Sequence, residues 1–69
     1  MDANIELAKS LFKQNKYQGT IDTCKKILVS DVNSIEAIKL IAKSLLATRK
    51  PDDARLYLNK ALNIIANNY

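Results

Sequence analysis

The chain has 69 residues, of which 48% are apolar, and carries a net charge of +4 at neutral pH. This length allows one small domain at most, and the apolar content argues against disorder. One cysteine and no histidine exclude an internal disulfide and the common zinc sites. Because no apolar run exceeds three residues, we expect no membrane span and no signal peptide, and a cytoplasmic location is the default.

The first half of the chain predicts two amphipathic helices, because its apolar residues recur at spacings of three and four. The first helix is expected from Asp2, a suitable N-cap, to Gln14. Asn15 interrupts the pattern, since asparagine tolerates the left-handed conformation that ends helices. The second helix is expected over 18–29. The two apolar stripes are Ile5, Leu7, Ala8, Leu11 and Phe12, and then Thr20, Ile21, Cys24, Ile27 and Leu28.

The second half predicts two further helices. Asn33 followed by Glu36 is similar to a capping box and should start the third helix, which closes over 48–50. Pro51 belongs in the first turn of the fourth helix, where its missing N–H costs nothing, and 67–68 should end that helix. The stripes are Ala37, Ile38, Ile41, Ala42, Leu45 and Leu46, and then Ala54, Tyr57, Leu58, Ala61, Leu62 and Ile65. No strand pattern competes, so the predicted fold class is all-α.

The two halves repeat with a constant offset, so that Ala8 corresponds to Ala42 and Leu11 corresponds to Leu45. A repeated helix–turn–helix unit of about 34 residues resembles the tetratricopeptide repeat (TPR) family. The second unit has the small and bulky apolar residues of the family at Ala42, Ala54 and Ala61 and at Ile38, Ile41, Leu45 and Leu58. The first unit matches at Leu7, Ala8, Leu11 and Tyr17, and departs from the family at Asn4, Thr20, Ile27 and Val32.

The resemblance implies one domain over 1–69, with unit one over 1–34 and unit two over 35–68. Its two antiparallel helix hairpins would stack as a short right-handed superhelix, or α-solenoid. An unrelated four-helix bundle would show similar apolar stripes, but its two halves would not be expected to repeat at a constant offset. Two units are few for such a stack, so we expect part of a longer protein or a self-associating unit. A homodimer would use the apolar surface of the last helix, formed by Tyr57, Leu58, Leu62 and Ile65.

In the TPR family, the first helix of each unit lines a groove that holds a peptide or a partner helix. Carried over to this sequence, the groove residues are Ile5, Lys9, Phe12 and Lys13 in unit one and Lys39, Lys43, Leu46 and Ala47 in unit two. The four lysines would favour an acidic, partly apolar protein or peptide. The alternative is that they are ordinary solvated surface residues. The subgroup that grips a C-terminal carboxylate is not supported, because Lys9 and Leu40 stand where it has asparagine.

No pattern typical of catalysis, a cofactor or a metal site is present. Cys24 lies on an apolar stripe and has no histidine to act as its base, so we expect a core residue. Asp52 and Asp53 suit the positive end of the fourth helix. The sequence therefore predicts a non-enzymatic protein-interaction module. The alternatives are a structural self-assembly unit without an external ligand, and a basic nucleic-acid-binding domain, which the few aromatic residues disfavour.

Overall fold

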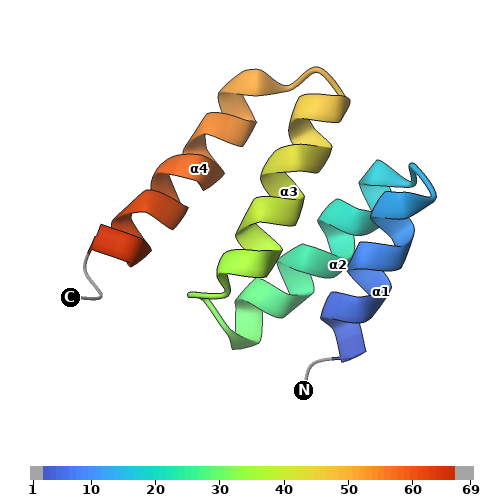
Figure 1. Ribbon diagram of the computed structural model, residues 1–69, viewed down its shortest axis with the longest axis horizontal. Helices are drawn as coiled ribbons and strands as arrows, with labels where there is room; N and C mark the ends of the chain where they lie inside the picture. Colours follow the sequence, from blue (N-terminus) through green and yellow to red (C-terminus); the bar gives the residue numbers. More distant parts are fainter. Residues whose placement is uncertain (1–2, 67–69) are drawn as a thin grey trace.

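A computed structural model describes residues 3–66, which form four helices and contain no strand (Figure 1). The helices are α1 (Ala3–Lys13), α2 (Tyr17–Ser30), α3 (Ile35–Ala47) and α4 (Pro51–Ala66). The prediction of an all-α fold with packed neighbouring helices is confirmed, and the arrangement is compatible with a solenoid. The expected N-cap Asp2 and the expected helix end at 67–68 lie outside the described residues.

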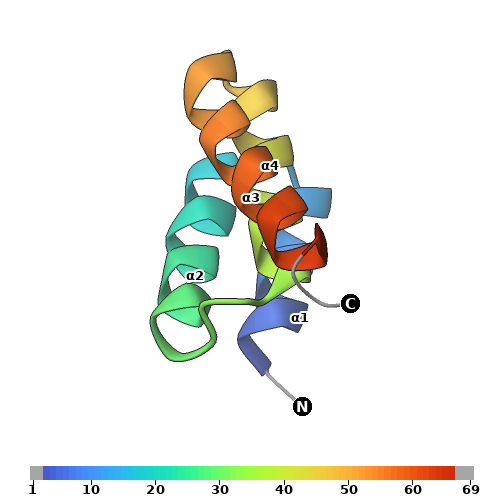
Figure 2. The same ribbon diagram turned by 90° about the vertical axis from the view of Figure 1, so that its left-hand side faces the viewer.

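The central helix of the fold is α3, which packs against α1, α2 and α4. Figure 1 shows α1 and α4 at opposite ends of the molecule, with α2 and α3 between them. Seen from the α4 end in Figure 2, α4 lies in front of α3. The main core brings together the apolar faces of α1, α2 and α3 and one residue of α4. Its members are Ile5, Ala8, Ile21, Cys24, Ile27, Ala37, Ile41, Leu45 and Ala54.

The turn between α1 and α2 is closed by backbone hydrogen bonds around Asn15, whose φ of 62° is left-handed as predicted. The Asn15 N–H donates to the Phe12 carbonyl at 3.0 Å, and the Lys16 N–H donates to the Leu11 carbonyl at 2.9 Å. This pair of bonds is a Schellman motif, which satisfies carbonyls that a helix end leaves free. The Tyr17 hydroxyl also donates to Asn15 Oδ1 at 2.9 Å, which ties the start of α2 to the turn.

The turn between α3 and α4 has the same geometry at the equivalent positions of the second unit. Arg49 has a φ of 62°, and its N–H donates to the Leu46 carbonyl at 3.1 Å. The Lys50 N–H donates to the Leu45 carbonyl at 2.8 Å. Pro51 then begins α4, as predicted. The repeat of the apolar positions is therefore also a repeat of backbone conformation and hydrogen bonding.

The N-terminus of α3 differs from the prediction. Its N-cap is Ser34, whose Oγ accepts a hydrogen bond from the Ala37 N–H at 3.4 Å. Because α3 begins at Ile35, Ser34 rather than Asn33 has the extended backbone that a capping side chain needs. Glu36 does not complete a capping box with Asn33, and its carboxylate lies against Lys9 of α1 instead.

The α4 helix meets α3 with one face and leaves an adjacent apolar face open. Ala54 and Ala61 are buried, Ile64 is partly buried, and Tyr57 packs against the core. The exposed fractions of the open face are 42% for Leu58, 63% for Leu62 and 50% for Ile65. Three of the four residues of the expected homodimer surface are therefore exposed, whereas the fourth, Tyr57, is half-buried.

Candidate functional site

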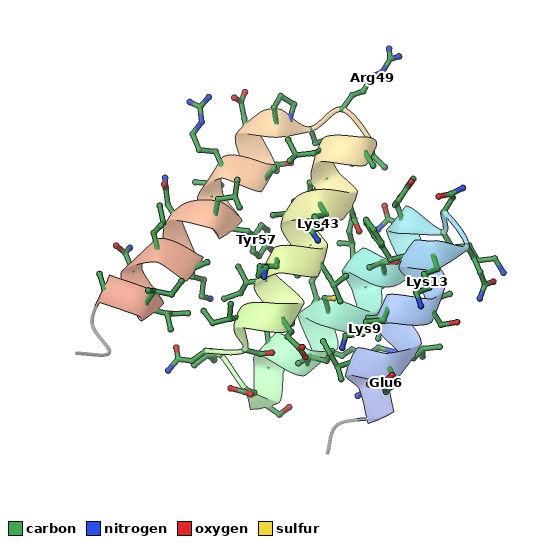
Figure 3. The ribbon with its side chains drawn as sticks, viewed as in Figure 1. Glu6, Lys9, Lys13, Lys43, Arg49 and Tyr57 are labelled. Atoms are coloured by element: carbon green, nitrogen blue, oxygen red, sulfur yellow. The ribbon has the colours of Figure 1, made fainter. Side chains whose placement is uncertain are left out.

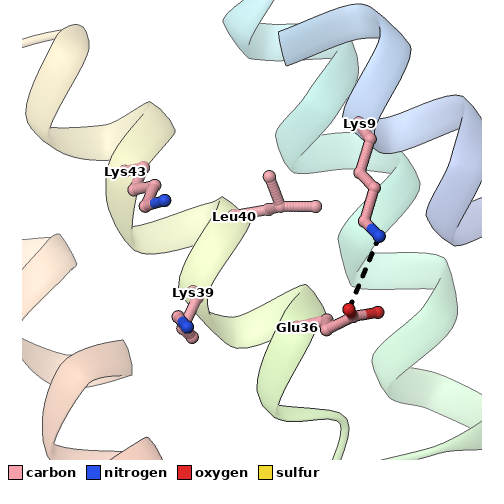
Figure 4. A pocket seen from close by; sticks show the side chains of 5 residues that line it. All are labelled: Lys9, Glu36, Lys39, Leu40 and Lys43. Carbon is pink, nitrogen blue, oxygen red and sulfur yellow. Dashed lines mark hydrogen bonds and ion pairs between the residues drawn. The ribbon is translucent and has the colours of Figure 1, made fainter.

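A small open pocket of about 150 Å³ lies where α1 approaches α3 (Figure 4). Four of its residues come from α3 and one comes from α1. They are Lys9, Glu36, Lys39, Leu40 and Lys43. The pocket therefore carries three ammonium groups and one carboxylate, so its surface is positive on balance.

An ion pair across this pocket joins α1 to α3. Lys9 Nζ lies 3.5 Å from Glu36 Oε1, with side chains 43% and 62% exposed. A pair as exposed as this contributes only about 0–1 kcal/mol, because water screens both charges. Its main consequence is local, since Glu36 neutralises part of the charge of the one lysine that α1 brings to the pocket.

The remaining cations lie on the same face of α3. Lys39 and Lys43 are one helical turn apart and both are exposed. In Figure 4 the side chain of Leu40 extends toward the Lys9 side, and Lys39 and Lys43 lie on the other side of it. Leu40 is partly buried and also packs against the core. The site is thus an apolar side chain with cations on both sides, an arrangement that suits an acidic ligand with an aliphatic group.

The structure brings together three of the four predicted groove lysines, Lys9, Lys39 and Lys43. Lys13 lies farther along α1 (Figure 3) and does not line the pocket. Phe12 packs edge-on against Tyr17, with ring centroids 5.6 Å apart, and is also not part of the pocket.

Three further predicted groove residues, all apolar, also lie outside the pocket. Ile5 is predicted on an open groove face, whereas it is only 8% exposed and belongs to the core. This core contains residues of α2, α3 and α4, and this packing between helices is not revealed by the helical spacing. Leu46 is 52% exposed and Ala47 is exposed, but neither lines the pocket.

Sequence reasoning misses Glu36 and Leu40 as site residues. The capping pattern predicts Glu36 only as part of a helix start. An acidic residue one helical turn before Lys39, on the helix that carries the lysines, could have indicated that it lies beside them.

A second, larger hollow between α2 and α4 is also not predicted. Its lining residues are Ile21, Lys25, Leu45, Asp53, Leu56 and Tyr57.

The single thiol is not poised for chemistry. Cys24 is completely buried, and that burial raises its pKa to about 11, so the nucleophilic thiolate is scarce at neutral pH. The expectation of a core cysteine is confirmed.

Within residues 3–66, no three His, Cys, Asp or Glu side chains gather in a way that could hold a metal ion. None of the helices formed by these residues is long and apolar enough to cross a membrane.

Comparison of the chain with protein-family models, curated proteins and solved structures finds no match in any of the three.

Proposed function

We propose that this protein is a non-enzymatic interaction module of TPR type that binds an acidic, partly apolar peptide or helix. The observation that carries the proposal is the pocket in which Lys9, Lys39 and Lys43 surround Leu40. Opposite charges on the two partners speed their encounter and exclude cationic competitors. The TPR part of the proposal is supported by the sequence repeat, which extends from apolar positions to both hairpin turns.

The apolar contact has to supply much of the affinity. Each exposed lysine contact is worth only about 0–1 kcal/mol, so three of them cannot hold a partner tightly. An aliphatic side chain placed on Leu40 would add burial, with carboxylates of the partner on both sides reaching Lys9 and the Lys39–Lys43 pair. A cytoplasmic location agrees with the unpaired thiol of Cys24.

The test uses a fluorescent 12-residue peptide of Glu-Glu-Leu repeats and measures anisotropy. A peptide of Lys-Lys-Leu repeats with the same apolar content serves as the opposite-charge control. The double variant Lys39→Glu/Lys43→Glu should weaken binding of the acidic peptide by about tenfold and reduce its salt dependence, since two attractions become repulsions. Lys60→Glu reverses one charge, half the change in the double variant, at an exposed α4 residue outside the pocket and should do little.

The proposal fails if the acidic peptide binds the double variant and the parent equally, or if both peptides bind alike. Binding of a single-stranded oligonucleotide in preference to the acidic peptide would support the nucleic-acid alternative instead.

A further inference from the structure

The contact between α2 and α3 shows how one unit covers the next. On α2, Cys24 is completely buried and Leu28 packs against the core. On α3, Ala37, Ile41 and Ser44 are all completely buried. Ala37, Ile41 and Ser44 share one face of α3, and Ala37 and Ile41 belong to the same core cluster as Cys24 of α2.

On α4, apolar residues occupy the positions equivalent to Cys24 and Leu28 of α2, but their side chains are exposed. Leu58 is the repeat equivalent of Cys24, and Leu62 is the repeat equivalent of Leu28. Leu58 and Leu62 are 42% and 63% exposed. With the neighbouring Ile65, which is 50% exposed, they form the tail face. Its first two residues correspond to the core-packed Cys24 and Leu28 of α2, whereas Ile65 corresponds to Asp31, which is exposed just beyond the end of α2.

On α1, the repeat places residues at the positions that are equivalent to the buried face of α3. Leu7 is the repeat equivalent of Ile41, and Ser10 is the repeat equivalent of Ser44. Both counterparts are completely buried on α3, whereas Leu7 is 50% exposed and Ser10 is exposed. In the sequence, Ala3 likewise stands at the position that corresponds to Ala37. Leu7 and Ser10 form the head face, which corresponds to the buried Ile41 and Ser44 of α3.

We propose that the head face of one copy packs on the tail face of a second copy and repeats the α2–α3 contact between molecules. The two faces belong to helices at opposite ends of the molecule (Figure 1). The contact is therefore heterologous, so each added copy leaves one head and one tail free and the assembly grows beyond a dimer.

A second copy suits the tail face because it supplies the complementary helix in the matching register. The charges beside the two faces are also compatible. Glu6 is exposed on α1 and is the sequence neighbour of Leu7 of the head face. Arg55 is exposed on α4, three residues before Leu58 of the tail face. Opposite charges at the rim favour correct docking even where they add little affinity.

The test blocks one face at a time and then mixes the variants. Leu7→Glu removes the head and Leu62→Glu removes the tail, each at a half-exposed position where the helix can accept glutamate. Ser10→Arg and Ile65→Arg repeat the test at second positions on the same faces. Val29→Glu is the control, because Val29 is 84% exposed on α2 and belongs to neither face. Circular dichroism checks that every variant keeps the helical content of the parent.

Sedimentation velocity gives the masses from about 10 μM to about 1 mM, the range in which weak association becomes visible. The parent and Val29→Glu should grow past the dimer with concentration, and each blocked variant alone should stay monomeric. An equimolar mixture of Leu7→Glu and Leu62→Glu should form a dimer and nothing larger, because only one head and one tail remain. A dimer of Leu7→Glu alone would show a symmetric α4–α4 contact and overturn the proposal, as would a parent that is monomeric throughout.

Discussion

Asn15 and Arg49 share the same left-handed backbone conformation, each with a φ of 62°, at equivalent positions of the two hairpin turns. This conformation costs an L-residue roughly 1–2 kcal/mol, and asparagine tolerates it better than most. Asn15 also accepts a hydrogen bond from the Tyr17 hydroxyl. Arg49 has neither advantage, and its side chain extends away from the body of the molecule (Figure 3). The second turn therefore stores strain that the first largely avoids.

The variant Arg49→Gly should release that strain. Glycine adopts a positive φ freely, but it also gives the unfolded chain more freedom, so the expected net gain is about 0.5–1 kcal/mol. Urea unfolding followed by circular dichroism would measure it. Arg49→Ala keeps the strain and should show no such gain. A loss of stability in the glycine variant would contradict the proposed strain.

How much of the fold can be predicted depends on whether the signal is local. Helical spacing and Pro51 place the four helices, and Asn15 marks the first turn. The rotation of each helix about its own axis is harder to predict from the sequence, because the apolar stripe on α4 is wider than the surface that α3 covers. The stripe therefore groups Leu58 with buried Ala54 and omits half-buried Ile64. Burial of Ile5 requires knowing how α1 packs on the other helices, and the pairing of Lys9 with Glu36 requires knowing that α1 packs on α3.

The variant Ser44→Ala should stabilise the protein. Ser44 is completely buried, and its hydroxyl has no hydrogen-bond partner within the described residues. Removing a buried, unpaired hydroxyl avoids its desolvation, and alanine is the better helix former, so the free energy of unfolding should rise by about 1 kcal/mol. Ser10→Ala is a matched control at the equivalent, exposed position and should gain about half as much at most. Equal gains would mean that the buried hydroxyl costs nothing.

The variant Ala42→Leu should destabilise the α3–α4 hairpin. Ala42 is 1% exposed, and Ala54 and Ala61 of α4 are also buried, so the two helices approach closely through small residues. Extra methyl groups at such a contact typically cost about 1–3 kcal/mol through displaced side chains and backbone. Thermal unfolding would show the loss. Ala47→Leu, at an exposed position of the same helix, should leave stability nearly unchanged, and a similar loss there would argue against the close contact.

The Cys24 thiol should make stability depend on pH in the alkaline range. Its pKa is raised from 9.0 to about 11 by burial, so the folded state keeps a proton that the unfolded state loses. The contribution is fully present below pH 9.0 and is lost as the pH rises toward about 11. It amounts to roughly 3 kcal/mol, and the measurement is urea unfolding at several pH values. Cys24→Ala removes this contribution, so the parent should lose more stability than the variant as the pH rises, and identical slopes would disprove it.

The carboxylate of Glu36 should act as an internal competitor of an acidic ligand. It lies 3.5 Å from Lys9 Nζ, so a carboxylate that approaches Lys9 has to displace it. Glu36→Gln keeps the size of the side chain and removes its charge, and the Glu-Glu-Leu peptide should then bind about two- to fivefold more tightly.

The control for this last effect is Glu6→Gln, which removes the same charge from α1 at an exposed residue outside the pocket. It raises the net charge equally but leaves the Lys9–Glu36 pair intact. A gain confined to Glu36→Gln would locate the competition at Lys9. Equal gains in both variants would show that the peptide responds to total charge, and the ion pair would then have no part in selecting the ligand.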